Sequence, residues 1–284
     1  MADIDLNIAP YNSGTGWTPI GTQNNPFRGH FNGNYRKVSG LYINVSSSYL
    51  GLFGNINNGS VRNLGVEGSS VTGVAYVGGM AGNIIGGSIT NCYTSVSVRT
   101  TNSAASNVGG VVGSLQNGSV INCYATGSVS GNYSVGGIVG NVQTSSITNC
   151  YAIGAVSGTS SHTGGVAGWF YSNLMRYCVG LNPSITRQSG SISTFGRVIG
   201  NFYGGTADNN VGWAGMTLPS GNASNHNGSN ITTEAAKEQF SYEVMQWKFG
   251  FNDDNPWKMG VGEYELPVFY WQTVAPAAMP AHLK

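Results

Sequence analysis

The chain has 284 residues and a formal net charge of +1; 44 residues are glycine and only 8% are charged. Its few basic residues are scattered, so no nucleic-acid partner is expected. No apolar run reaches the roughly 18 residues that a membrane-spanning helix needs, so no membrane span is expected either.

The first five residues, Met-Ala-Asp-Ile-Asp, lack the basic start and apolar segment of a secretory signal. We therefore expect either part of a larger polypeptide or assembly, or a protein that leaves its cell by another route.

Residues 1–45 precede a repeat array and are predicted to form its N-terminal cap, because the end of a stacked array exposes apolar core. The apolar residues expected to cover that end are Ile4, Leu6, Trp17, Phe27 and Phe31.

The repeat array is marked by a glycine tetrad that returns six times at intervals of 27 to 32 residues. The six copies are Gly-Leu-Phe-Gly (51–54), Gly-Met-Ala-Gly (79–82), Gly-Val-Val-Gly (110–113), Gly-Ile-Val-Gly (137–140), Gly-Val-Ala-Gly (165–168) and the longer Gly-Arg-Val-Ile-Gly (196–200). A period of this size predicts a stacked repeat architecture. Such an array is typically a surface for contact without a built-in reactive centre.

Each repeat is predicted to form one coil of three short strands. From Cys123 onward, small apolar residues alternate with polar residues or tyrosine, which is the period-two pattern of a half-buried strand. We therefore predict an all-β fold, a right-handed parallel β-helix (β-solenoid) of about six coils over residues 46–215. The bases Arg176, Arg187 and Arg197, with Pro183, predict a change of coil shape within residues 170–212.

Asparagine recurs at one turn position from coil to coil. Asn63, Asn91, Asn122 and Asn149 occupy one slot, where asparagine tolerates a bend and stacked amides can bond to one another.

Three cysteines, Cys92, Cys123 and Cys150, share one inward slot on consecutive coils. Coils stack at about 4.8 Å whereas the Cβ atoms of a disulfide lie about 3.8 Å apart, so buried free thiols are expected. Cys178 is predicted to break this register and point outward, with Tyr177 in the cysteine slot. The four histidines are far apart in the sequence and there is no Cys-X-X-Cys, so neither a metal site nor a cofactor is expected.

The C-terminal part is predicted to cap the column over residues 216–272, with a flexible tail over 273–284. One helix is expected at about 233–240, with Thr232 as its N-cap. The aromatic residues expected to pack in this cap are Trp247, Phe249, Phe251, Trp257 and those of residues 268–271.

The chain resembles the GLUG-repeat family, whose members occur in bacterial surface and secreted proteins, including filamentous-haemagglutinin-like adhesins. The resemblance rests on the tetrads, on the opening segments at residues 3–6, 17–21 and 26–34, and on the closing segments at 257–259 and 265–271. Together these cover roughly residues 3–272. The resemblance implies a secreted or cell-surface location, and it transfers no catalytic residue because the family has no consensus catalytic motif.

A row of tyrosines is the candidate ligand-binding site. Tyr93, Tyr124 and Tyr151 fall on one outward slot, one per coil, so their rings are expected about 4.8 Å apart. Exposed rings flanked by small polar residues suit the faces of sugars. The alternative is that these tyrosines only brace neighbouring coils.

Two functions remain open. The first is a non-catalytic binding or structural module, adhesin-like, that recognises surface glycans, a host cell or a partner protein. The second is a polysaccharide-acting enzyme, because parallel β-helices also host lyases and hydrolases. Glycoside hydrolysis needs two carboxylates about 5–9.5 Å apart, and residues 6–207 contain a single acid, Glu67. Such an enzyme would have to use the acids of the C-terminal cap: Asp253, Asp254, Glu263 and Glu265.

Overall fold

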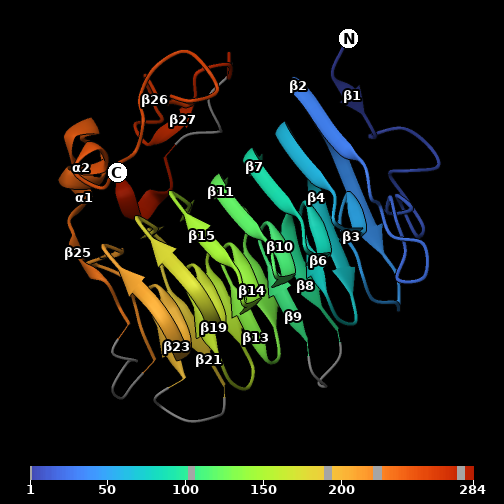
Figure 1. Ribbon diagram of the computed structural model, residues 1–284, viewed down its shortest axis with the longest axis horizontal. Helices are drawn as coiled ribbons and strands as arrows, with labels where there is room; N and C mark the ends of the chain where they lie inside the picture. Colours follow the sequence, from blue (N-terminus) through green and yellow to red (C-terminus); the bar gives the residue numbers. More distant parts are fainter. Residues whose placement is uncertain (1, 102–105, 189–193, 220–225, 274–278) are drawn as a thin grey trace.

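The computed structural model describes residues 2–101, 106–188, 194–219, 226–273 and 279–284. Its strands stack along the long axis of the molecule from the N-terminal to the C-terminal coils (Figure 1). Neighbouring strands of the column pair in parallel, so the predicted all-β parallel solenoid is confirmed.

One face of the column follows the glycine tetrads. Its strands are β3 (Phe53–Asn57), β6 (Ala81–Ile85), β10 (Val112–Gln116), β14 (Val139–Gln143) and the first halves of β19 (Ala167–Arg176) and β23 (Ile199–Asp208). The register places equivalent residues of successive coils side by side, for example Leu115 beside Val142.

A second face comprises the strands that follow the next turn. These are β2 (His30–Asn44), β4 (Ser60–Gly73), β7 (Ser88–Thr94), β11 (Ser119–Ala125), β15 (Ser146–Thr148), β16 (Tyr151–Ala152), β20 (Val179–Gly180), β24 (Val211–Trp213) and β25 (Ser229–Ile231). The short β1 (Ile4–Asp5) pairs with β2 at the N-terminal edge.

The remaining strands complete each coil. A third face contains β8 (Ser97–Thr100), β12 (Val129–Gly131), β17 (Val156–Gly158) and β21 (Ile185–Arg187). A separate parallel sheet of two- and three-residue strands leads into the tetrads: β5 (Val77–Gly78), β9 (Asn107–Gly109), β13 (Ser134–Gly136), β18 (Thr163–Gly164) and β22 (Phe195–Gly196).

The tetrad glycines lie where the backbones of neighbouring coils approach closely. A Cβ on Gly82 would stand 2.5 Å from the backbone nitrogen of Leu50, and one on Gly140 would stand 2.4 Å from that of Val108. Real side chains do not fit at such distances, so these positions require glycine. The central tetrad residues Met80 and Ala81 are fully buried.

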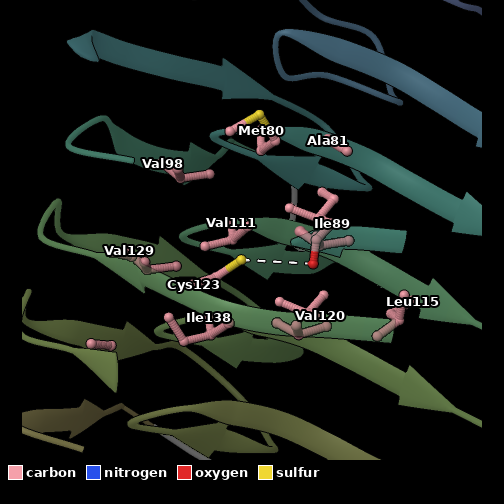
Figure 2. Close-up of a cluster of buried hydrophobic side chains, with 14 of the residues drawn as sticks. Met80, Ala81, Ile89, Val98, Val111, Leu115, Val120, Cys123, Val129 and Ile138 are labelled. Atoms are coloured by element: carbon pink, nitrogen blue, oxygen red, sulfur yellow. Dashed lines mark hydrogen bonds between the residues drawn. The ribbon is translucent and has the colours of Figure 1, made fainter. Parts of the chain in front are cut away.

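The core inside the coils is a continuous cluster of small and branched apolar residues (Figure 2). The strands contribute their inward residues, such as Val120, Cys123 and Ala125 of β11, where the left-handed Asn122 shifts the alternation between Val120 and Cys123. At the N-terminal end Leu6 is buried and Trp17, Phe27 and Phe31 pack against the same core. Ile4, which was expected to cover that end, is 53% exposed, because its two-residue strand lies at the edge of β2.

The predicted asparagine ladder is present over Asn63, Asn91 and Asn122, whereas the Oδ1 of Asn149 is buried without a hydrogen-bond partner among the described residues. Asn91 donates to the Oδ1 of Asn63 at 3.2 Å, and Asn122 donates to the Oδ1 of Asn91 at 3.0 Å. Asn63, Asn91, Asn122 and Asn149 all have φ between 50° and 54°, the left-handed region that asparagine tolerates better than most residues.

All four cysteines are buried free thiols. The outward position predicted for Cys178 is wrong: its thiol is fully buried and contacts the carbonyl of Ile147, just as that of Cys150 contacts the carbonyl of Val120. Tyr177 instead takes the turn slot of the asparagine ladder, with φ of 57°. The cysteine slot therefore continues through four coils.

The C-terminal residues fold back against the side of the column beside β11 and β15 (Figure 1). They contain an antiparallel pair, β26 (Trp257–Met259) and β27 (Pro267–Phe269), and two helices, α1 (Thr233–Ala236) and α2 (Gln239–Glu243). The single helix predicted at 233–240 is thus broken in two, because Glu238 is extended, and the break lets Tyr242 enter the core of the cap. Thr232 caps α1 as predicted, accepting a hydrogen bond from the amide of Ala235.

The end of the chain is attached to the column. Residues 274–278 of the expected tail lie outside the described residues. Met279 and Leu283 are buried in the core of the cap, and His282 makes a 2.8 Å contact with the carbonyl of Leu181. A short 3-10 turn, Ala281–Leu283, ends the described chain.

Candidate functional site

The tyrosine row predicted as a binding platform lies underneath the C-terminal cap. The rings of Tyr93, Tyr124 and Tyr151 stack nearly parallel at 5.1 and 4.9 Å, as the coil spacing predicts. However, Tyr93 is only 4% exposed and the other two are fully buried. The row points away from the coil core, as expected, but the cap covers it, so it offers no exposed face to a ligand.

The hydroxyls of this row hold the cap in place. Tyr124 donates to the Oε1 of Gln272 at 2.9 Å, and the hydroxyl of Tyr151 donates to the carbonyl of Pro267 at 2.6 Å. Burial raises the pKa of both phenols well above the ordinary value, so they stay protonated at physiological pH. The geometry is that of a structural brace between coils and cap.

The acids of the cap make contacts that hold the structure together. Asp253 accepts hydrogen bonds from Tyr35 at 2.8 Å and from Asn63, the ladder residue, at 3.2 Å. Glu265 pairs with Lys237 at 3.2 Å. Within the described ranges, no group of three or more histidine, cysteine or acidic side chains could hold a metal ion.

A polar groove runs parallel to the column axis at the turn between the first and second faces. Its volume is about 670 Å³, and it is lined by the same turn in successive coils. The lining residues are His30, Asn58, Gly59, Ser60, Gly86, Gly87, Ser88, Asn117, Gly118, Ser119, Thr144, Ser145, Ser146 and Asn173. Six coils at about 4.8 Å per step give the groove a length of about 24 Å.

The groove is open because its floor is glycine. A Cβ on Gly118 would stand 2.4 Å from the carbonyl oxygen of Gly87, so no side chain can fill this position. The serines beside the floor, Ser88 and Ser119, are half-buried and lie in register on neighbouring strands. Their hydroxyls therefore repeat at the coil spacing along one wall.

A row of amides borders the groove on the first face. Gln116 and Gln143 lie in register, and the Nε2 of Gln116 donates to the Oε1 of Gln143 at 3.1 Å. Ile85 interrupts this row in the next coil, and Asn57 continues it toward the N-terminal end. No charged side chain stands in this row, and His30 is the one titratable residue lining the groove.

Exposed aromatic rings take over the amide row at its C-terminal end. Tyr171, the register partner of Gln143, is 54% exposed, and Tyr203 on the next coil is 72% exposed. Their ring centroids are 5.8 Å apart and their planes meet at 81°. Trp169, two residues before Tyr171, is half-buried on the same face.

The sequence interpretation missed these rings. The signal was present in the segment Gly168-Trp-Phe-Tyr171, where bulky rings replace the amides at the outward positions of a strand. Alternation alone places Tyr124 and Tyr171 equally outward, and only the folded cap distinguishes the covered ring from the open one.

Among the described helices, none has the length and apolar character needed to cross a membrane.

Comparison with known proteins places recognised repeats in the column. Residues 104–130 and 131–157 each match the GLUG motif, so the predicted resemblance is confirmed for these two repeats. They make up the coils around β11, β12 and β14, which contribute the middle of the polar groove.

Two curated proteins align with part of the chain. A "Putative Gly-rich membrane protein" of Evansella cellulosilytica is 44% identical over 91 residues, which are 30% of this chain and 10% of that protein. Halomucin of Haloquadratum walsbyi is 40% identical over 85 residues, 28% of this chain and 1% of that protein. The chain therefore aligns with a tenth or less of either relative.

A solved structure shares the fold over nearly the whole chain. It is described as a "putative immunoglobulin A1 protease" of Bacteroides ovatus, with a TM-score of 0.65 and 22% sequence identity. The superposition covers 95% of this chain and 84% of that one. At this identity the likeness concerns the architecture.

Proposed function

We propose that this chain is a non-catalytic extracellular binding module, adhesin-like, that contacts uncharged glycans of a cell surface through the polar groove. The main observation in support of the proposal is the groove itself. It is open, has a volume of about 670 Å³, and is lined by a turn with few charges that repeats along the column. Hydroxyls and amides in regular array can bond to the hydroxyls of a neutral polymer without first losing an ionic hydration shell.

The relatives support an extracellular location. One is described as a membrane protein and another as halomucin, and both are much longer than the matching segment. A stacked column that serves as one part of a long surface polypeptide fits these relationships. These relationships support a location at the cell surface or outside the cell.

A binding role is also favoured over the enzyme alternative. Asp253, one of the acids of the cap, is engaged with Tyr35 and Asn63. Residues 6–207 contain one acid, Glu67, and its carboxylate is occupied by Lys37 at 2.9 Å and by the hydroxyl of Tyr93 at 2.8 Å. Both carboxylates are thus engaged in contacts within the fold, whereas glycoside hydrolysis needs two carboxylates placed across a sugar.

The test is a binding screen of the whole chain against immobilised neutral, uronic-acid and sulfated glycans. Binding is expected to neutral glycans and to fall by about tenfold or more in Ser119→Arg, which places a long charged side chain over the groove floor. Ser128→Arg is the matched control, because Ser128 is exposed on another part of the coil. Absence of binding to every neutral glycan, or full binding by Ser119→Arg, would contradict the proposal.

A further inference from the structure

We infer that Tyr171 and Tyr203 form a subsite that holds one sugar ring of an uncharged glycan at the C-terminal end of the groove. This inference rests on the proposed function and assigns it a specific anchoring point. The two residues are the most exposed tyrosines of the described chain, at 54% and 72%. Neither hydroxyl makes a hydrogen bond within the ranges that the structure describes.

The backbone of this coil is irregular in a way that presents both rings. The pairing of β19 with β23 shifts register after Phe170, so that Tyr171 lies opposite Gly204 and Tyr203 becomes an extra residue. Gly205 has φ of 103°, a conformation that favours glycine. Such bulges redirect side chains, and here the bulge brings Tyr203 beside Tyr171.

The ring of Tyr171 lies beside Gly204 of the next coil. A Cβ added to Gly204 would stand 3.9 Å from the Cδ2 and Cε2 atoms of Tyr171, at ordinary contact distance. A small side chain at position 204 would therefore fit beside the Tyr171 ring. The ring of Tyr203 stands almost perpendicular to it at 5.8 Å. Together the rings form a corner with one stacking face and one edge.

Polar groups are available around this corner. Gln143 uses its Oε1 to accept from Gln116, which leaves its Nε2 as a donor beside Tyr171. Asn173, two residues after Tyr171, is exposed and lines the groove. A sugar ring has C–H faces that pack on aromatic rings and hydroxyls that bond to amides, so this combination matches its chemistry.

Charge argues for a neutral occupant. The nearest charged groups on the same two strands are Arg176 and Asp208, which bind each other with an Nη2–Oδ2 distance of 2.9 Å. Their charges compensate, so the two strands that carry the rings offer no unpaired charge to a sulfate or carboxylate. The ligand expected at this subsite is therefore an uncharged sugar.

The experiment measures binding of neutral glucan, mannan, xylan and galactan oligosaccharides by calorimetry, using the whole chain. Replacing both rings, Tyr171→Ala with Tyr203→Ala, is expected to weaken binding by about tenfold or more, since the rings supply the apolar area on which a sugar packs. Tyr171→Phe keeps the stacking face and is expected to stay close to the parent. Phe251→Ala, which removes an 81% exposed ring on the cap, is the matched control.

The outcomes separate this inference from the proposed function. If the double variant binds as the parent does while Ser119→Arg does not bind, the subsite is refuted and the groove remains. If the parent binds none of the four oligosaccharide types, the function and the subsite fail together. Unchanged thermal unfolding of the double variant is the check that weaker binding reflects lost contacts, since both rings are at the surface.

Discussion

The asparagine ladder shows how a single residue type meets two demands of a coil. Asn122 has φ of 50° and also donates to the Oδ1 of Asn91 in the neighbouring coil at 3.0 Å. Glycine would meet the backbone demand but would lack the amide. A branched side chain would meet neither, because left-handed backbone is strongly unfavourable for it.

Substitutions at Asn122 should separate these two contributions. Asn122→Gly is expected to lower the free energy of unfolding by about 1 kcal/mol, the usual worth of one hydrogen bond. Asn122→Val should lower it by about 1–3 kcal/mol more, because valine adds backbone strain. Urea denaturation of the two variants measures the difference. Equal losses would show that backbone strain plays no part at this position.

The buried thiols and phenols predict alkaline instability. Burial raises the pKa of Cys92 and Cys150 and that of Tyr124 and Tyr151 above their unfolded values. The folded form thus retains protons that the unfolded form loses, and stability falls as pH rises. The contribution of these groups to the free energy of unfolding should be fully present below about pH 8.5, the ordinary thiol pKa, and should decline above it.

Urea midpoints measured at several pH values between neutral and about pH 10 test this expectation. The double variant Cys92→Ala with Cys150→Ala should show a shallower decline in the thiol range, while the tyrosines still titrate at higher pH. A midpoint that stays constant through this range would contradict the assignment. Its control is the same titration at low pH, where the parent and variant should run parallel.

At the scale of elements, the cap depends on a few polar contacts made through its aromatic core. Gln272 is buried and is hydrogen-bonded to the hydroxyl of Tyr124. Its Oε1 also accepts a hydrogen bond from the backbone amide of Phe269 at 2.8 Å. The side chain thus links β27 to the covered tyrosine row. Removing it would leave both partners buried without a hydrogen bond.

Gln272→Leu is therefore expected to destabilise the cap by about 2–4 kcal/mol. The cap holds Trp247, Trp257 and Trp271, so its loosening should shift tryptophan fluorescence to longer wavelength before the β-sheet circular dichroism is lost. Gln239→Leu, an exposed glutamine on α2, is the control and should change little. A single transition at the parent midpoint would count against an independent role for this contact.

Local pattern predicted the column but not what covers it. The alternation around Cys123 and the glycines of the tetrads serve contacts between adjacent coils. Because adjacent coils have similar sequences, these features recur along the chain and can be recognised from the sequence alone. The burial of Tyr124 depends on Gln272, which lies 148 residues further along the chain. The repeat pattern contains no signal for this contact, so the sequence did not predict it. The exposed Tyr203 arises from a bulge that departs from the repeat. Both the covered and the open rings thus follow from non-repeating parts of the chain.

At the scale of the whole molecule, stacking converts a short turn into a long surface. One turn such as Gly118–Ser119 provides a glycine floor and one hydroxyl, which is too little for specific binding. Repetition along the axis gives a groove of about 24 Å, with the aromatic corner at one end. A ligand that engages several turns gains several weak contacts for one loss of translational freedom.

This geometry predicts how affinity depends on ligand length and salt. Affinity for neutral oligosaccharides should rise with chain length until the ligand spans about 24 Å, then level off, because further units reach beyond the groove. It should change less than about twofold between low and physiological salt, since no charged side chain stands in the amide row and charge screening has little to act on. Calorimetry on a length series at two salt concentrations measures both. Affinity that is independent of length would restrict binding to the corner of Tyr171 and Tyr203, and a steep salt dependence would point to the scattered arginines instead.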